Sequence, residues 1–349
     1  MTPIFYLSTA AHTCALARYL GSPGGRRLAR SVVPVTYERV LDRMTRRFWT
    51  RMAKEAWWGL APDPWSWRHV DTRWWWRELV VRLSKWVRAG GTPAAGVYIF
   101  ADLELLSREE ARRAAALWTE LADTGRAMRL VNHPTRSMRR YELLRTLYER
   151  GINRFNVYRV TEARAPTRYP VFLRFENDHG GARTPLLGGR SELEAALAAM
   201  ERDGASRDEI LITEFCETAD EGGVYRKYGA FVVGEHVFPK SLQFSRRWVQ
   251  KRPDLAESWM LDEEREYVEK NPHEEILREV FALARIGYGR ADYGIADGAL
   301  QIWEINTNPH ITTTPERRPR RPRVYDLVEQ RMTAALEELA RGRPMAEAR

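Results

Sequence analysis

The stretch 287-GYGRADYGIADGALQIWEINTNPHI-311 contains two β-rich runs separated by Asp297-Gly298, a pair typical of a tight turn. The first run carries Asp292, and the second carries Glu304 and Asn306. Side chains two residues apart leave the same face of a strand. Two carboxylates and an amide oxygen are ligands that Mg²⁺ accepts alongside water and phosphate. The stretch therefore predicts a β-hairpin with a magnesium site on one face.

The length of the turn decides whether these ligands meet. A two-residue loop would pair Ala296 with Ala299 and place Asp292 on the face opposite Glu304. A three-residue loop with a bulge would pair Ala296 with Leu300 and set Asp292 across from Glu304. We therefore predict the longer loop. An ordinary hairpin with solvated acids is the alternative.

The segment 169-YPVFLRFENDHGG-181 is a second candidate for ligand binding, because a β-rich run ends there in two glycines. Gly180 and Gly181 allow backbone N–H groups to approach phosphate oxygens closely. Arg174 stands near them, and its planar guanidinium can bind phosphate through two donors. His179 could touch a phosphate or an acceptor, or cap the loop. A plain strand-ending turn is the alternative.

Four segments of the chain resemble motifs of the ATP-grasp family, and they follow one another along the chain in the same order as in that family. The pattern D-x(11)-E-x-N-x-N-P, which ends at Pro309, looks like its metal-binding end, and 169–181 resembles its central strand and glycine loop. The segment 209-EILITEFCE-217 resembles the linker that meets adenine, and 132-NHPTRSMRRYELLRTLYERGIN-153 resembles the segment that opens the fold. The resemblance covers residues from roughly 130 to 312.

The resemblance implies an α/β fold with a defined domain order. A small N-terminal α/β domain would occupy residues 1–131, and an ATP-grasp domain would occupy 132–340. The latter would consist of two α+β subdomains that sandwich ATP, with a lid at about 155–213. Residues 341–349 are expected to form a flexible tail.

The resemblance also assigns roles to residues. Mg²⁺, or alternatively Mn²⁺, would be bound by Asp292, Glu304 and Asn306. Arginines stand where the family has two lysines, at Arg140 (or equally Arg139) and at Arg174. The other expected ATP contacts are Gly180, Gly181, Lys227 and the linker residues Glu214, Phe215, Cys216 and Glu217. The expected catalytic residues are Arg174, His179 and Lys240. An arginine expected near the phosphates has no clear match, and Lys240, Arg246 and Arg247 are candidates.

The implied activity is that of an ADP-forming carboxylate–amine ligase that works through an acyl phosphate. A kinase of the same fold and a non-catalytic nucleotide-binding protein are the alternatives. The substrates would be an amine and a carboxylate on a small molecule, peptide or glycan, since the N-terminal region is basic and rich in tryptophan.

A tryptophan-rich insert at about residues 42–90 interrupts the N-terminal domain, with nine of the 13 tryptophans between Phe48 and Trp86. It could be a helical subdomain packed on the α/β core, a groove for a substrate or partner, or a surface that lies on a membrane. Trp74, Trp75 and Trp76 cannot all face one side of a helix, because consecutive residues are about 100° apart.

The composition narrows the class of protein. The net charge is +9, but the basic residues are spread along the chain and no nucleic-acid-binding signature accompanies them, so nucleic acid is not expected as a partner. No run of 18 apolar residues and no signal peptide are visible, and Cys14 and Cys216 are expected to be small buried residues. A cytoplasmic location is therefore expected.

Local signals place several elements outside the hairpin. Strands are predicted at 3–9, 96–101 and 210–215, and a long hairpin at 223–245 turns at Gly234-Glu235. Capping boxes at Ser107 and Ser191 predict helices over 108–122 and 191–203. The amphipathic helix 324–339 could pack on its own domain or on a second subunit.

Overall fold

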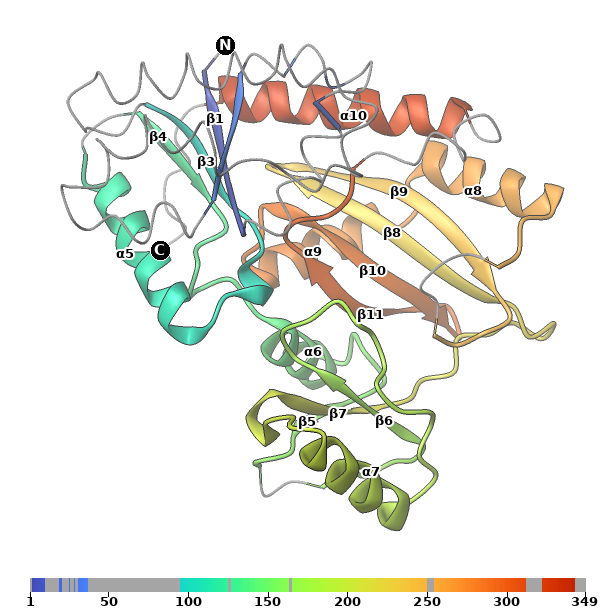
Figure 1. The fold of residues 1–349 in the computed structure, drawn as a ribbon. Helices are drawn as coiled ribbons and strands as arrows, with labels where there is room; N and C mark the ends of the chain where they lie inside the picture. The colour runs from blue at the N-terminus through green and yellow to red at the C-terminus, as the bar shows by residue number, and fades with distance from the viewer. Residues whose placement is uncertain are drawn as a thin grey trace, which may run out of the picture.

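The computed structural model describes residues 2–9, 19–20, 25, 28, 31–36, 95–124, 127–162, 165–249, 254–311 and 322–342. The predicted tryptophan-rich insert, Cys14 and most of the predicted tail lie outside these residues. The described strands form three sheets, which Figure 1 shows as an N-terminal sheet, a large central sheet and a small sheet at the bottom of the view. None of the described helices is both long and apolar enough to cross a membrane.

The N-terminal sheet is parallel and has the order β2-β1-β3-β4. Its strands are β1 (Ile4–Ser8), β2 (Val32–Thr36), β3 (Gly96–Phe100) and β4 (Met128–Val131). Helix α5 (Arg108–Ala122) begins at the predicted capping box, in which Ser107 and Glu110 each accept a hydrogen bond from the other's backbone N–H. Parallel strands alternating with a helix confirm the predicted α/β class.

The small sheet is antiparallel and has the order β5-β7-β6. It consists of β5 (Val157–Arg159), β6 (Val171–Phe175) and β7 (Ile210–Glu214), and α7 (Arg190–Arg202) packs on it. The predicted capping box at Ser191 is wrong. Gly189 is the N-cap, so Ser191 lies inside the first turn, where its hydroxyl cannot act as the cap.

The large sheet is antiparallel, with the order β11-β10-β8-β9. It consists of β8 (Tyr225–Val233), β9 (His236–Ser245), β10 (Tyr288–Ala296) and β11 (Ala299–Asn306). The predicted turn at Gly234-Glu235 is confirmed, because Val233 pairs with His236. Helices α8 (Ser258–Lys270), α9 (Glu274–Ala284) and α10 (Pro322–Arg341) pack on this sheet, so the predicted C-terminal helix covers its own domain.

Helix α6 (Arg140–Glu149) joins the two antiparallel sheets, because it contacts β5 of the small sheet and β11 of the large one. Leu143 and Leu147 face the large core, whereas Leu144 packs with Phe155 near the small sheet. The predicted domain boundaries remain predictions, but the helix explains how the two sheets are held on either side of one space.

The turn between β10 and β11 differs from the prediction. Ala296 pairs with Ala299, so the loop has two residues, and both Asp297 and Gly298 have positive φ angles (45° and 76°), as a tight primed turn requires. The predicted three-residue loop is therefore wrong. Asp292 nevertheless pairs with Glu304, because a bulge shifts the register just beyond Tyr293.

Trp303 is the extra residue of this bulge, since Tyr293 pairs with Ile302 and Asp292 with Glu304. Its indole needs the space above Gly294, where a Cβ atom would lie 2.7 Å from Trp303 Cζ2. The ring packs beside the cluster of Leu144 and Phe155. The bulge therefore does two things: it aligns the carboxylates and turns an indole toward the small sheet.

Gly294→Ala should destabilise the protein by about 1–3 kcal/mol, because the added methyl group overpacks the indole. Urea unfolding measures this change. Gly188→Ala is the control, since Gly188 is exposed and its Cβ would meet nothing closer than 3.7 Å. Equal stability of the two variants would contradict the packing of Trp303 on Gly294.

Candidate active site

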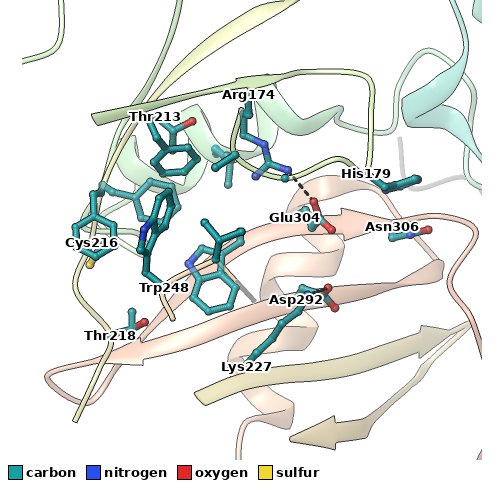
Figure 2. Close-up of a pocket in the computed structure, with 18 of the residues that line it drawn as sticks. Arg174, His179, Thr213, Cys216, Thr218, Lys227, Trp248, Asp292, Glu304 and Asn306 are labelled. Atoms are coloured by element: carbon teal, nitrogen blue, oxygen red, sulfur yellow. Dashed lines mark hydrogen bonds and ion pairs between the residues drawn. The ribbon is translucent and has the colours of Figure 1, made fainter. Parts of the chain in front are cut away.

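A cavity of about 520 Å³ lies between the small and large sheets. Both sheets contribute to its wall, as Figure 2 shows, with Arg174 and Thr213 on one side and Lys227, Asp292 and Glu304 on the other. One end is charged and the other is aromatic. Asp102, His179, Asn308 and His310 extend the charged end toward the N-terminal sheet.

Asp292 is buried at the charged end and contacts two cations. Lys227 Nζ lies 2.7 Å from its Oδ2 atom, and Arg290 donates from Nε to Oδ1 at 2.6 Å and from Nη2 to Oδ2 at 2.9 Å. Burial alone would raise the pKa of Asp292, but Arg290 and Lys227 outweigh it and lower the pKa. The carboxylate is therefore ionised at neutral pH.

Glu304 also contacts two cations. Its Oε2 atom lies 2.6 Å from Arg140 Nη2 and 3.0 Å from Arg174 Nη2, the latter contact spanning the two sheets. Burial opposes ionisation, yet Arg140 and Arg174 hold the pKa of Glu304 far below its usual value. Burial and the neighbouring Arg140 lower the pKa of Arg174 to about 10. The Arg174 guanidinium therefore remains charged at neutral pH.

Four cations share two carboxylates in this ion-pair network, so the network itself carries an excess of positive charge, and Asp102 is a third acid at this end of the cavity. Such a site suits a polyanion. Arg140, Arg174 and Lys227 were predicted from the sequence, whereas Arg290 was not. The strand spacing could have indicated Arg290, since it stands two residues before Asp292 and its side chain therefore leaves the same face of β10.

The two other arginine candidates lie elsewhere. Arg246 Nη1 donates to the carbonyl of Gly222 at 2.6 Å, and neither Arg246 nor Arg247 is part of the cavity wall. Arg139 binds the carbonyls of Glu104 and Leu106, whereas Arg140 contacts Glu304 of the site, although Arg140 itself does not line the cavity.

The predicted metal ligands meet at the charged end. Asp292 and Glu304 are cross-strand partners, and Asn306 lines the same cavity, with its Oδ1 atom accepting a hydrogen bond from the Asn308 N–H at 2.7 Å. Two carboxylates and an amide are hard oxygen donors that fit Mg²⁺ with water and phosphate as further ligands. Within the described ranges, no group of three or more acidic, histidine or cysteine side chains is placed to hold a metal ion.

The other end of the cavity is aromatic. Trp248 lies 5.0 Å from the ring of Phe172 and 5.6 Å from that of Phe215, measured between centroids, and Trp303 lines the same end. A flat apolar slot of this kind can stack a planar ring. Trp248, which lies just beyond the long hairpin, was not predicted from the sequence. Cys216 is only partly buried here rather than buried as expected, and this burial raises the pKa of its thiol.

The linker after β7 lies beside this slot, but its side chains serve the fold. The Glu214 carboxylate is buried and accepts hydrogen bonds from Tyr158 Oη at 2.9 Å and from Arg168 Nη2 at 2.9 Å. The backbone N–H groups of Glu214 and Phe215 donate to the carbonyls of Asn156 and Pro170, so neither is open to a ligand. The predicted contacts with adenine would therefore have to come from the backbone carbonyl groups of this linker and from Cys216.

The structure does not bring every predicted residue to the cavity wall. Gly181 and His179 line it, but Gly180 does not, and its N–H donates to Asp178 Oδ1 at 3.0 Å. The Glu217 carboxylate folds back onto the N–H groups of Thr218 and Ala219.

Lys240 is also outside the wall. It sits at a bulge of β9, where its ammonium group donates to the His310 carbonyl. Burial and the nearby Arg290 hold the pKa of Lys240 well below its usual range. It is therefore next to the charged end rather than part of the cavity surface.

Glu304→Gln should lower the free energy of unfolding by about 3 kcal/mol, because it leaves Arg140 and Arg174 buried without a counter-charge. Urea unfolding at neutral pH measures this loss. Glu149→Gln is the matched control, since its pair with Arg145 is solvent-exposed on the glutamate side and should be worth less than about 0.5 kcal/mol. Similar small losses in both variants would refute the role of Glu304 as the shared counter-charge.

No family model and no curated protein matches the sequence. Among solved structures, the chain is similar to a D-alanine–D-alanine ligase from Bacillus anthracis at 11% identity, over 97% of this chain and 99% of that one, with a TM-score of 0.47. It is similar to an L-amino acid ligase from Bacillus licheniformis at 12% identity, over 96% of this chain and 74% of that one, with a TM-score of 0.48. A RimK domain ATP-grasp protein from Sphaerobacter thermophilus shows 14% identity, over 97% of this chain and 100% of that one, with a TM-score of 0.46.

These identities and TM-scores are low, and they carry no information about substrates. The fold is therefore defined by the chain's own geometry. Two antiparallel sheets with their helices line the cavity, and a small parallel α/β sheet lies next to them. This arrangement agrees with the α/β fold class that is expected from the sequence.

Proposed function

We propose that the protein is an ATP- and magnesium-dependent carboxylate–amine ligase that forms ADP. One observation carries the proposal: Asp292 and Glu304 are cross-strand partners whose carboxylates are shared by four cations, in a cavity whose other end is an aromatic slot. A nucleotide has the complementary shape, since it joins a flat base to a polyphosphate.

The charged end would bind the polyphosphate. Phosphate oxygens can replace carboxylate oxygens on Arg140, Arg174, Lys227 and Arg290, because both are anionic acceptors of the same hydrogen bonds. The exchange would leave Asp292 and Glu304 free to bind a divalent cation with Asn306. When bound, Mg²⁺ would neutralise the phosphate oxygens and hold them in one orientation.

The protein's own residues would then position the reacting groups. A substrate carboxylate attacks the γ-phosphorus, the bond from that phosphorus to the β-phosphate oxygen breaks, and ADP leaves with the electron pair. An amine next attacks the acyl carbon, phosphate leaves, and the amine's proton is released to solvent. The four cations stabilise the charge that develops on the phosphate oxygens. The attacking carboxylate is already ionised, so its step needs no general base.

The acceptor would enter from the side of the N-terminal sheet, where Asp102, His179 and His310 line the cavity. A small-molecule, peptide or glycan carboxylate remains the proposed class of acid, and the amine is a second substrate. The proposed setting is the cytoplasm, where ATP is abundant.

Turnover tests the proposal directly. The wild type should convert ATP into ADP and free phosphate when a pool of carboxylates and a pool of amines are present together with Mg²⁺. Asp292→Asn and Glu304→Gln should each lower kcat at least about 100-fold, because each removes a charge that organises the transferring group. Arg190→Gln, whose pair with Glu194 is exposed, is the control. ADP without free phosphate would indicate a kinase, and binding without turnover would leave a non-catalytic protein.

Metal binding offers a separate test, because Lys227 competes with a cation for Asp292. Mn²⁺ titration followed by electron paramagnetic resonance should show weak binding to the wild type alone and much tighter binding with the β,γ-imido analogue of ATP. Lys227→Met should tighten binding of Mn²⁺ alone about tenfold and weaken binding of the analogue, so the two affinities move in opposite directions. A parallel loss of both would contradict the proposed exchange of partners.

A further inference from the structure

The glycine turn, residues Glu176–Gly181, covers the charged end of the cavity. It follows β6 of the small sheet, and His179 and Gly181 form part of the cavity wall. Across from it lies the short helix η3 (Leu103–Leu105) of the N-terminal region. The two segments are far apart in the sequence and follow strands of different sheets, yet two polar contacts connect them.

Arg139 makes the first contact. Its Nη2 atom lies 2.9 Å from Asn177 Oδ1 in the glycine turn, 3.0 Å from the carbonyl oxygen of Glu104 and 2.7 Å from that of Leu106. One guanidinium therefore bridges the turn and η3. Arg139 is the N-cap residue of α6 and does not line the cavity.

Glu104 makes the second contact. Its Oε1 atom lies 3.5 Å from His179 Nε2. The carboxylate is buried and held in place by Thr307, whose Oγ1 and N atoms lie 2.5 Å and 3.2 Å from its two oxygens. Thr307 directly follows the proposed metal ligand Asn306. The same carboxylate therefore connects the glycine turn to the end of the strand that carries the site.

We infer that Arg139 and Glu104 are positioning residues that hold the glycine turn closed against η3. They act through Asn177 and His179, and neither lines the cavity. This role rests on the proposed function, because a closed turn protects an intermediate only if an acyl phosphate forms in the cavity. An acyl phosphate exposed to water is lost, because water attacks it, the bond to phosphate breaks, and free carboxylate and phosphate result. A closed turn would exclude that water.

Hydrogen exchange of backbone amides, followed by mass spectrometry on the full chain, tests the contacts. They join parts of the chain to each other, so the first measurement needs no nucleotide. Arg139→Gln and Asn177→Ala should each speed exchange in residues 176–183 roughly tenfold, the effect of losing one charge-assisted hydrogen bond. The double variant should be no faster than either single variant, because both remove the same contact.

Further variants distinguish a local effect on the glycine turn from a general loss of stability. Arg136→Gln removes a nearby exposed arginine and should leave exchange in 176–183 unchanged. Glu104→Gln should also speed exchange there, and the partly exposed Asn177 provides the same test if the buried Glu104 variant does not fold. Unchanged exchange in Asn177→Ala, or exchange that rises equally in α9, would overturn the inference.

A second arm distinguishes the inference from the proposed function. The β,γ-imido analogue of ATP with Mg²⁺ should slow exchange of the turn in the wild type, and less so in Arg139→Gln and Asn177→Ala. If the analogue changes nothing in the wild type while the variants still exchange faster without it, the proposed function fails and the positioning role stands. The opposite pattern, a response to the analogue with no effect of the variants, rejects the positioning role alone.

Discussion

The site depends on two buried carboxylates shared by four cations. Asp292 and Glu304 come from adjacent strands of the large sheet, whereas their cationic partners come from α6, the small sheet and the large sheet. Removing either carboxylate would leave buried cations uncompensated, and removing the cations would leave buried acids. The network therefore orients the small sheet over the large one, and its excess of positive charge suits the polyphosphate that we propose it binds.

The bulge at Trp303 is the backbone feature that makes this network possible. A tight two-residue turn at Asp297-Gly298 would by itself put Asp292 and Glu304 on opposite faces. One extra residue on β11, Trp303, shifts the register between Tyr293 and Asp292 of β10, so that Asp292 pairs with Glu304. The same residue supplies an indole to the aromatic end of the cavity, so one irregularity contributes to both ends of the site. Bulges next to functional sites commonly redirect side chains in this way.

Local sequence signals predicted much of the fold and of the charged site. β-rich runs and turn residues placed β6, β7 and the four strands of the large sheet, and a capping box placed the start of α5, whereas the three-residue strand β5 was not predicted. The second capping box failed, because Gly189 precedes the helix and Ser191 falls within its first turn. Arg290 was missed although its position on β10 was informative. Trp248 could not be found from the sequence, because it reaches the aromatic slot from a segment with no strand or helix pattern.

The sequence by itself determined which side chains were available: hard oxygen ligands on one hairpin, arginines near a glycine turn, and elements with clear periodicity. These are local properties, because the pleat of a strand and the capping of a helix depend on residues a few positions apart. Only the tertiary structure decided which of these side chains meet. The choice of Arg140 over Arg139 as the partner of Glu304, the pairing of Lys227 with Asp292 and the contact of the glycine turn with η3 each join segments that are far apart in the sequence. Such contacts arise from packing between distant parts of the chain, which no local pattern encodes.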